Sequence, residues 1–134
     1  MDEALLYTDG AARGNPGPAG AGAVLLDPRG NELAALTRYL GKATNNVAEY
    51  QALILGLEEA AIQKVRRLKV HLDSELVVRQ LNGQYKVRNP HLKPLYQRVL
   101  ALLRAFDQVS IIHVRREFNR RADQLANQAI DQAD

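Results

Sequence analysis

Two acidic residues stand at the ends of short segments that alternate apolar and polar side chains as β-strands do. Asp9 closes segment 4–9, and Asp73 closes segment 68–73. If these strands are parallel neighbours joined through a helix, their carboxylates meet at one edge of the sheet. A glycine- and proline-rich turn follows Asp9, and its slim backbone leaves room for a ligand. Taken alone, this stretch is equally typical of a hairpin with a surface aspartate.

Two further acids fall near the starts of expected helices. Glu49 follows the cap-type residues 44–46, and Asp123 follows Asn119, which we expect to cap the last helix. The helix dipole favours acids at such positions, so each has a structural explanation when it is considered alone. The joint placement of all four acids predicts a cluster.

Carboxylates gathered in one crevice repel one another, and the pKa values of some of them rise unless cations bind. Oxygen ligands without cysteine or clustered histidine favour Mg²⁺ or Mn²⁺ over zinc. Two such ions about 3.5–4 Å apart can stabilise both the attacking water and the leaving oxygen of an in-line phosphoryl transfer. The four acids therefore suit hydrolysis of a phosphate ester.

The elements that must position these acids follow from the hydrophobic pattern. Three short strands joined by tight turns predict an antiparallel meander, and a helix, a fourth strand, two helices, a fifth strand and a last helix follow. We expect the meander at 4–9, 21–26 and 33–39, the fourth and fifth strands at 68–73 and 109–114, a short helix capped by Ser74, and a longer helix opening at Asn89–Pro90. This order predicts an α/β protein with one mixed sheet covered by helices.

The composition is that of one globular domain, 1–134, with 46% hydrophobic and 25% charged residues. We expect no membrane segment and no signal peptide, and the lack of cysteine fits a cytoplasmic protein. The net charge of +3 permits a polyanionic partner. We expect a monomer with no obligate protein partner.

Four motifs in order across the chain resemble type 1 ribonuclease H: TDGAARGNPGPAGAG, TNNVAEY, LDSELVVRQL and NRRADQLAN. The resemblance implies a ribonuclease H-like fold, with antiparallel strands 1–3, parallel strands 1, 4 and 5, and helices on both faces of the sheet. It also implies that the RNA strand of an RNA–DNA hybrid is cleaved to 5′-phosphate and 3′-hydroxyl ends. In that family, the acids matching Asp9, Glu49, Asp73 and Asp123 are catalytic and bind two Mg²⁺ ions, with Mn²⁺ as a substitute.

The same resemblance implies a substrate-binding surface. Asn15 and Asn45 match residues that read 2′-hydroxyls in the minor groove, and Thr44 matches a residue that holds a DNA phosphate. Thr44 and Asn45 also have an ordinary helix-capping explanation.

The chain departs from the family pattern at three places. Glu75 stands where many members carry Gln, and a carboxylate accepts a hydrogen bond from a 2′-hydroxyl but cannot donate one. The loop before the last helix lacks a histidine that many members carry, so Arg115 or Arg116 is a candidate to hold a phosphate instead. The basic, tryptophan-bearing insertion of many bacterial members is missing, which predicts weaker hybrid binding with a shallower salt dependence.

Two of the three histidines lie on expected strands. We expect His71 to pack and His113, in the fifth strand, to be structural. Segment 20–25 does not match a dinucleotide-binding loop, because a strand follows it where a helix is required. Two other functions remain open: a module that binds hybrids without cutting them, and a nuclease that also acts on double-stranded RNA.

Overall fold

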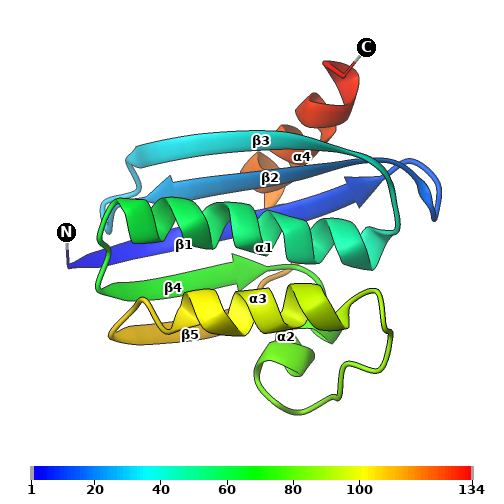
Figure 1. Cartoon of the computed structure of the whole chain (residues 1–134). Helices are drawn as coiled ribbons and strands as arrows, with labels where there is room; N and C mark the ends of the chain where they lie inside the picture. Colours follow the sequence, from blue (N-terminus) through cyan, green and yellow to red (C-terminus); the bar gives the residue numbers. More distant parts are fainter. Residues whose placement is uncertain (1, 134) are drawn as a thin grey trace.

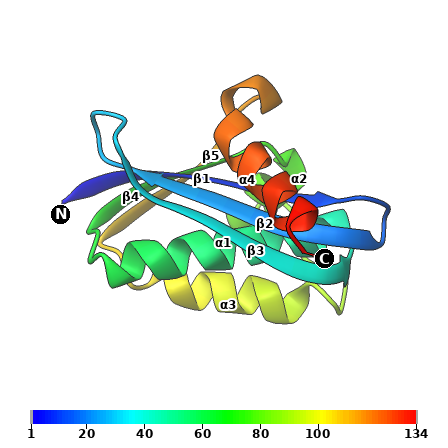
Figure 2. The same ribbon diagram turned by 90° about the horizontal axis from the view of Figure 1, so that it is seen from above.

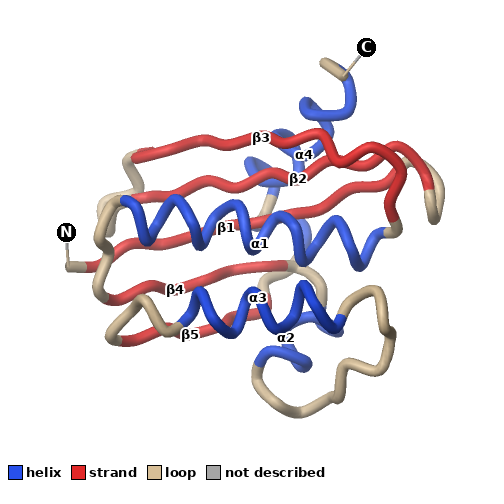
Figure 3. The backbone as a smooth tube through the Cα atoms, viewed as in Figure 1, coloured by secondary structure: helices blue, strands red, loops and turns tan. Residues whose placement is uncertain are grey.

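Strand β1 (Glu3–Ala12) lies at the centre of a five-stranded sheet in the computed structural model, which describes residues 2–133. The strand order is β3-β2-β1-β4-β5, where the other strands are β2 (Gly17–Leu26), β3 (Glu32–Ala43), β4 (Arg67–Leu72) and β5 (Gln108–His113) (Figures 1 and 3). Strands β1, β2 and β3 pair antiparallel, whereas β4 is parallel to both β1 and β5. The predicted mixed sheet is confirmed.

Helices cover both faces of this sheet, as predicted. Figure 2 shows α1 (Asn45–Ile62) and α3 (Lys93–Leu103) on one face and α4 (Arg120–Asp131) on the other. The short α2 (Glu75–Leu81) follows β4, and a 3₁₀ turn, η1 (Arg116–Phe118), precedes α4. Asp9 lies in β1, Asp73 directly follows β4, and Asp123 lies in the first turn of α4.

The main core lies between the sheet and α1. Alternate side chains of β1 and β4, such as Leu6 and Val70, are fully buried there together with Leu53 and Leu57 of α1. Alternation in the strands and three-to-four spacing in the helix place these apolar side chains on facing surfaces.

The first three strands extend further than the sequence predicted, so Asp9 lies within β1 rather than at its last residue. Strand β2 begins at Gly17, which pairs with Ala43 of β3, and Gly20 and Gly22 of the same strand lie directly against α4. A Cβ atom at Gly22 would lie 2.4 Å from the Ala122 carbonyl oxygen, and one at Gly10 would lie 2.2 Å from the Ala48 carbonyl carbon. These two glycines let α4 and α1 approach the sheet backbone, and the expectation that the turn after Asp9 leaves room for a ligand stays a prediction.

Two of the predicted helix caps are present, and two other helix starts differ from the prediction. Thr44 Oγ1 accepts from Val47 N at 3.3 Å, and Ser74 Oγ accepts from Val77 N at the same distance. Helix α3 begins at Lys93 rather than at Asn89–Pro90, because Asn89 instead closes a turn in which its carbonyl accepts from Leu92 N. Asn119 occupies the N-cap position of α4, but its side chain makes no capping hydrogen bond.

No helix within residues 2–133 combines the length and the apolar character needed to cross a membrane.

Candidate active site

Three of the four predicted acids come together at the carboxyl end of β1. Asp9, Glu49 and Asp73 each present a carboxylate oxygen, and these three oxygens lie within 4.8 Å of one another. The parallel pairing of β1 with β4 puts Tyr7 opposite His71, so Asp9 and Asp73, each two residues further along, lie side by side. Asp9 and Glu49 are buried, and Asp73 is half-buried.

Glu49 is held by the backbone that follows Asp9. Gly10 N donates to Glu49 Oε1 at 3.2 Å, a contact that depends on the close approach of α1 to Gly10. Glu49 Oε2 is buried and has no hydrogen-bond partner within residues 2–133. An unpaired buried carboxylate oxygen is unfavourable unless something else neutralises it. The all-carboxylate set therefore fits a hard divalent cation.

Burial and mutual repulsion perturb the two buried acids. Burial, followed by the charges of Glu49 and Asp73, raises the pKa of Asp9 far above its usual range. Burial also raises the pKa of Glu49, although hydrogen bonds from Asp9 and from Gly10 N oppose this shift. Without a cation, the cluster therefore retains a proton between Asp9 and Glu49 at neutral pH.

Asp123 lines the same cleft from the other layer of the protein. The cleft has a volume of about 360 Å³, and its lining includes Asp123 with the three clustered acids, Asn45 and Arg116. Asp123 lies in the first turn of α4, is exposed, and stands outside the group of three oxygens that lie within 4.8 Å of one another.

Asn119 fixes the start of α4 against β1, a role that the sequence did not indicate. Its side chain is almost fully buried, and its Nδ2 donates to Thr8 O at 2.9 Å. Thr8 directly precedes Asp9, so this bond joins the helix that carries Asp123 to the strand that carries Asp9. An asparagine before a helix is so commonly a cap that the sequence pattern concealed this second use.

Of the predicted substrate-binding residues in the first loop and at the start of α1, only Asn45 lines the cleft with the acids. Asn15 Oδ1 accepts from Asn45 N at 3.1 Å, so the loop between β1 and β2 is tied to the start of α1. Asn45 lines the cleft, whereas Thr44 caps the helix one residue earlier.

Of the three residues predicted as weaker substrate contacts, only one lies in the cleft. Arg116 lines the cleft with the acids, and its charge opposes the rise in the pKa of Glu49. Arg115 instead pairs with Glu117 at 3.3 Å. Glu75 pairs with Arg79 at 2.8 Å on the exposed side of α2 and does not line the cleft. Two adjacent arginines look equivalent in sequence, and only the 3₁₀ turn directs them apart.

The histidines lie outside the carboxylate cluster. His71 is buried and stacks on Tyr7 with ring centroids 4.2 Å apart, which confirms the predicted packing role. His113 is the exposed last residue of β5. The connection between α2 and α3 carries exposed basic residues, Lys86, Arg88 and His91, near Tyr85, whose ring lies under the guanidinium of Arg79.

Comparisons with known proteins agree with this geometry. The family described as "Reverse transcriptase-like" matches residues 7–129. The chain is 47% identical over 127 residues to "Ribonuclease HI" of Halobacterium salinarum, covering 95% of this chain and 64% of that protein. It is also 44% identical over 130 residues to a "Bifunctional protein" of Mycobacterium tuberculosis, covering 96% of this chain and 36% of that protein. The chain thus spans about two thirds or less of these relatives.

Solved structures give the same result. The N-terminal RNase H domain of the Mycobacterium tuberculosis protein superimposes with a TM-score of 0.95 at 42% identity, covering 98% of this chain and 95% of that chain. LC11-RNase H1, solved in complex with an RNA/DNA hybrid, superimposes with a TM-score of 0.92 at 44% identity, covering 97% of this chain and 98% of that chain. The shared strand order, the match through nearly the whole length and the identity with these proteins place the chain in the type 1 ribonuclease H family.

Proposed function

We propose that this chain hydrolyses the RNA strand of RNA–DNA hybrids in a reaction that needs divalent cations, and that it leaves 5′-phosphate and 3′-hydroxyl ends. The observation that carries the proposal is the convergence of Asp9, Glu49 and Asp73, together with the unpaired buried oxygen of Glu49. A relative at 44% identity has been solved with an RNA/DNA hybrid, which supports this choice of substrate.

Asp9, Glu49, Asp73 and Asp123 would hold the cations, with Mg²⁺ as the first expectation and Mn²⁺ as a substitute. When bound, two such ions supply positive charge that favours the attack of water and the departure of the 3′ oxygen. The chain's own contribution is rigid placement. Glu49 is fixed by Gly10 N, and the hydrogen bond between Asn119 and Thr8 holds α4 beside Asp9.

Residues beside the acids would recognise the hybrid. Asn15 uses its Oδ1 to bind Asn45 N, which leaves its Nδ2 directed to other acceptors such as a ribose 2′-hydroxyl. Asn45 lines the cleft and would bind a 2′-hydroxyl of the RNA strand, and Thr44 remains the candidate for a DNA phosphate. Arg116 would hold a phosphate near the acids, whereas the pairing of Arg115 with Glu117 makes Arg115 a weaker candidate.

A panel of labelled duplexes tests the proposal. RNA–DNA, RNA–RNA and DNA–DNA duplexes of one sequence are incubated with Mg²⁺, with Mn²⁺ and with EDTA, and the product ends are mapped. We expect cleavage of the hybrid that needs the cation and is lost in Asp9→Asn. Binding of the hybrid without cleavage in either cation would instead favour a binding module, and equal cleavage of RNA–RNA would widen the substrate class.

A further inference from the structure

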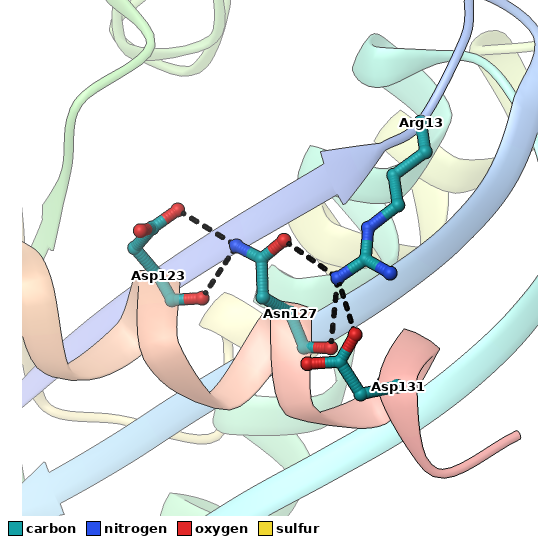
Figure 4. A network of polar contacts seen from close by, with 4 residues as sticks. All are labelled: Arg13, Asp123, Asn127 and Asp131. Atoms are coloured by element: carbon teal, nitrogen blue, oxygen red, sulfur yellow. Dashed lines mark hydrogen bonds and ion pairs between the residues drawn. The ribbon is translucent and has the colours of Figure 1, made fainter.

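Asp123 is held in place by a chain of polar contacts along the exposed side of α4 (Figure 4). One turn further along the helix, Asn127 Nδ2 donates to Asp123 Oδ1 at 3.2 Å and to Asp123 O at 3.0 Å. Arg13, in the loop after β1, donates from one guanidinium nitrogen to Asn127 Oδ1 at 3.3 Å and pairs with Asp131 at 2.7 Å.

These contacts fix which way the Asn127 amide faces. The guanidinium of Arg13 can only donate, so it selects the oxygen of the amide as its partner. The amide nitrogen is then directed at Asp123, where it donates to one carboxylate oxygen. A neutral donor orients a carboxylate without neutralising its charge, whereas a lysine or arginine at position 127 would compete with a cation for that charge.

Stability is a poor explanation for this arrangement. The side chains of Arg13 and Asp131 are 47% and 62% exposed, and ion pairs that are this exposed contribute little to folding. Asp123 is the one acid of the four that lies on a helix of the opposite face of the sheet, and its side chain is exposed. It therefore has the greatest need of a partner that sets the direction of its carboxylate.

We propose that Asn127 is a positioning residue that orients Asp123 for cation binding, and that Arg13 acts through Asn127 by fixing its amide. The proposal rests on the proposed function only in taking Asp123 as a cation ligand. Arg13 stands two residues before Asn15, so one loop contacts α4 through Arg13 and the start of α1 through Asn15. Partners that orient metal ligands typically change affinity by about 10- to 100-fold when they are removed.

The first experiment measures Mn²⁺ binding by titration calorimetry in the absence of nucleic acid. Asn127→Ala and Asn127→Leu, which preserves much of the side-chain volume but has no donor, should both weaken Mn²⁺ binding by about tenfold. The matched control is Gln128→Ala, which removes the neighbouring amide of the same helix. The side chain of Gln128 makes no hydrogen bond within residues 2–133, so this variant should bind as the wild type does.

Steady-state cleavage of the hybrid supplies a second measurement. Asn127→Ala should lower kcat by about tenfold and leave KM for the hybrid within about twofold, because orientation of a cation ligand acts on the chemical step. Raising Mn²⁺ to a saturating concentration should restore much of the lost kcat. A purely structural defect would not respond to the cation.

A double-mutant cycle separates the two possible roles of Arg13. If Arg13 acts through Asn127, Arg13→Ala lowers Mn²⁺ affinity about threefold, and it has no further effect in the Asn127→Ala background. If Arg13 instead binds a phosphate of the hybrid, Arg13→Ala raises KM, adds to the Asn127→Ala effect and leaves Mn²⁺ binding unchanged. The second result would overturn the role that we assign to Arg13.

Failure of this inference can be distinguished from failure of the proposed function. Wild-type Mn²⁺ affinity in Asn127→Ala and Asn127→Leu refutes the inference even if the hybrid is cleaved. Weakened binding in both variants supports it even if the hybrid is not cleaved. A wild-type protein that binds no Mn²⁺ would refute it as well, since Asp123 would then have no cation to orient.

Discussion

Replacing Asp9 by asparagine should stabilise the cation-free protein while abolishing cleavage. The substitution keeps the shape of the side chain and removes one charge from a cluster whose oxygens lie within 4.8 Å of one another. Protonated Asp9 donates to Glu49, and the amide of asparagine can donate in its place.

Two independent estimates give a similar size for this effect. Two unit charges at that separation repel by about 3.5 kcal/mol at an effective dielectric constant of about 20. The protein avoids the repulsion by keeping Asp9 protonated, and holding a proton at pH 7 on a carboxyl with an unfolded pKa of about 3.9 costs about 4 kcal/mol. Because denatured chains are compact and the native cluster relaxes, we expect a gain of about 2–4 kcal/mol at pH 7.

The sign of the pH dependence follows from the raised pKa of Asp9. The folded protein binds this proton more tightly than the unfolded chain does, with a pKa raised to about 10. The contribution of Asp9 to stability is therefore fully present below about pH 4, and it falls by up to about 1.4 kcal/mol per pH unit as the pH rises toward 10. The advantage of Asp9→Asn should be near zero at pH 4 and should widen steadily above it.

Urea unfolding in EDTA at several values of pH between 4 and 9 measures this difference. The matched control is Asp27→Asn, the same chemical change at a carboxyl whose pKa is lowered by hydrogen bonds from Asn31 and Arg29. Asp27→Asn should lose stability at neutral pH rather than gain it, and the loss should disappear in acid. Mg²⁺ should raise the stability of the wild type more than that of Asp9→Asn.

The reasoning about the buried charge would be refuted if the difference in free energy of unfolding between Asp9→Asn and the wild type did not change between pH 4 and pH 8. Loss of stability at pH 7 in EDTA would do the same. Near wild-type cleavage by Asp9→Asn would remove Asp9 from the catalytic site, whatever its effect on stability.

Four other features give predictions of their own. Gly10→Ala should lower the free energy of unfolding, measured in urea, by about 2 kcal/mol or more, because the new Cβ would lie 2.2 Å from the Ala48 backbone. An unchanged free energy of unfolding would mean that α1 can move away from β1. Arg116→Ala should lower kcat/KM by about 10- to 100-fold, whereas Arg115→Ala should stay near wild type, and equal losses would contradict the separation of their side chains. Asn119→Ala leaves the Thr8 carbonyl without its donor, so unfolding should become easier by about 1–3 kcal/mol, and Mn²⁺ affinity should fall as α4 loosens. Hybrid binding should weaken with salt along a shallower slope than that of a family member carrying the basic insertion, and equal slopes would contradict the loss of phosphate contacts.

The sequence predicted the elements that bring the acids together, because strand alternation and helix periodicity are local patterns. Asp9 and Asp73 could be assigned to one sheet edge as soon as their strands were taken as parallel neighbours. The start of α3 was missed because Asn89 and Pro90 are equally good at closing a turn. The full length of β2 was missed because glycine and alanine carry little strand preference, and this part of β2 is held by pairing with β1 and β3, which lies beyond any local pattern.

The residues that support the site could not be predicted from the sequence, for a different reason. Asn119 and Thr8 are 111 residues apart, and nothing local to either residue indicates the bond between them. The same is true of Arg13 and Asn127, which are 114 residues apart. Polar side chains can satisfy many partners, so their actual contacts are known only once the backbone has been placed.

The placement of Asp123 on the opposite face of the sheet has a consequence for the motions of the protein. A cation held by Asp123 together with Asp9 would act as a non-covalent crosslink between the two layers, joining α4 to the sheet end that also carries Glu49 and Asp73. Without it, α4 is tied to β1 and β2 mainly by the Asn119 bond, by Arg13 and by packing along Gly20 and Gly22. In EDTA, the amide hydrogens of α4 should therefore exchange faster than those of the rest of the protein, because α4 can open on its own. When Mg²⁺ is added, they should exchange only through global unfolding. The cation would then favour the conformations in which α4 is docked on the sheet. The fraction of time that α4 is docked would limit how often all four acids are in place together.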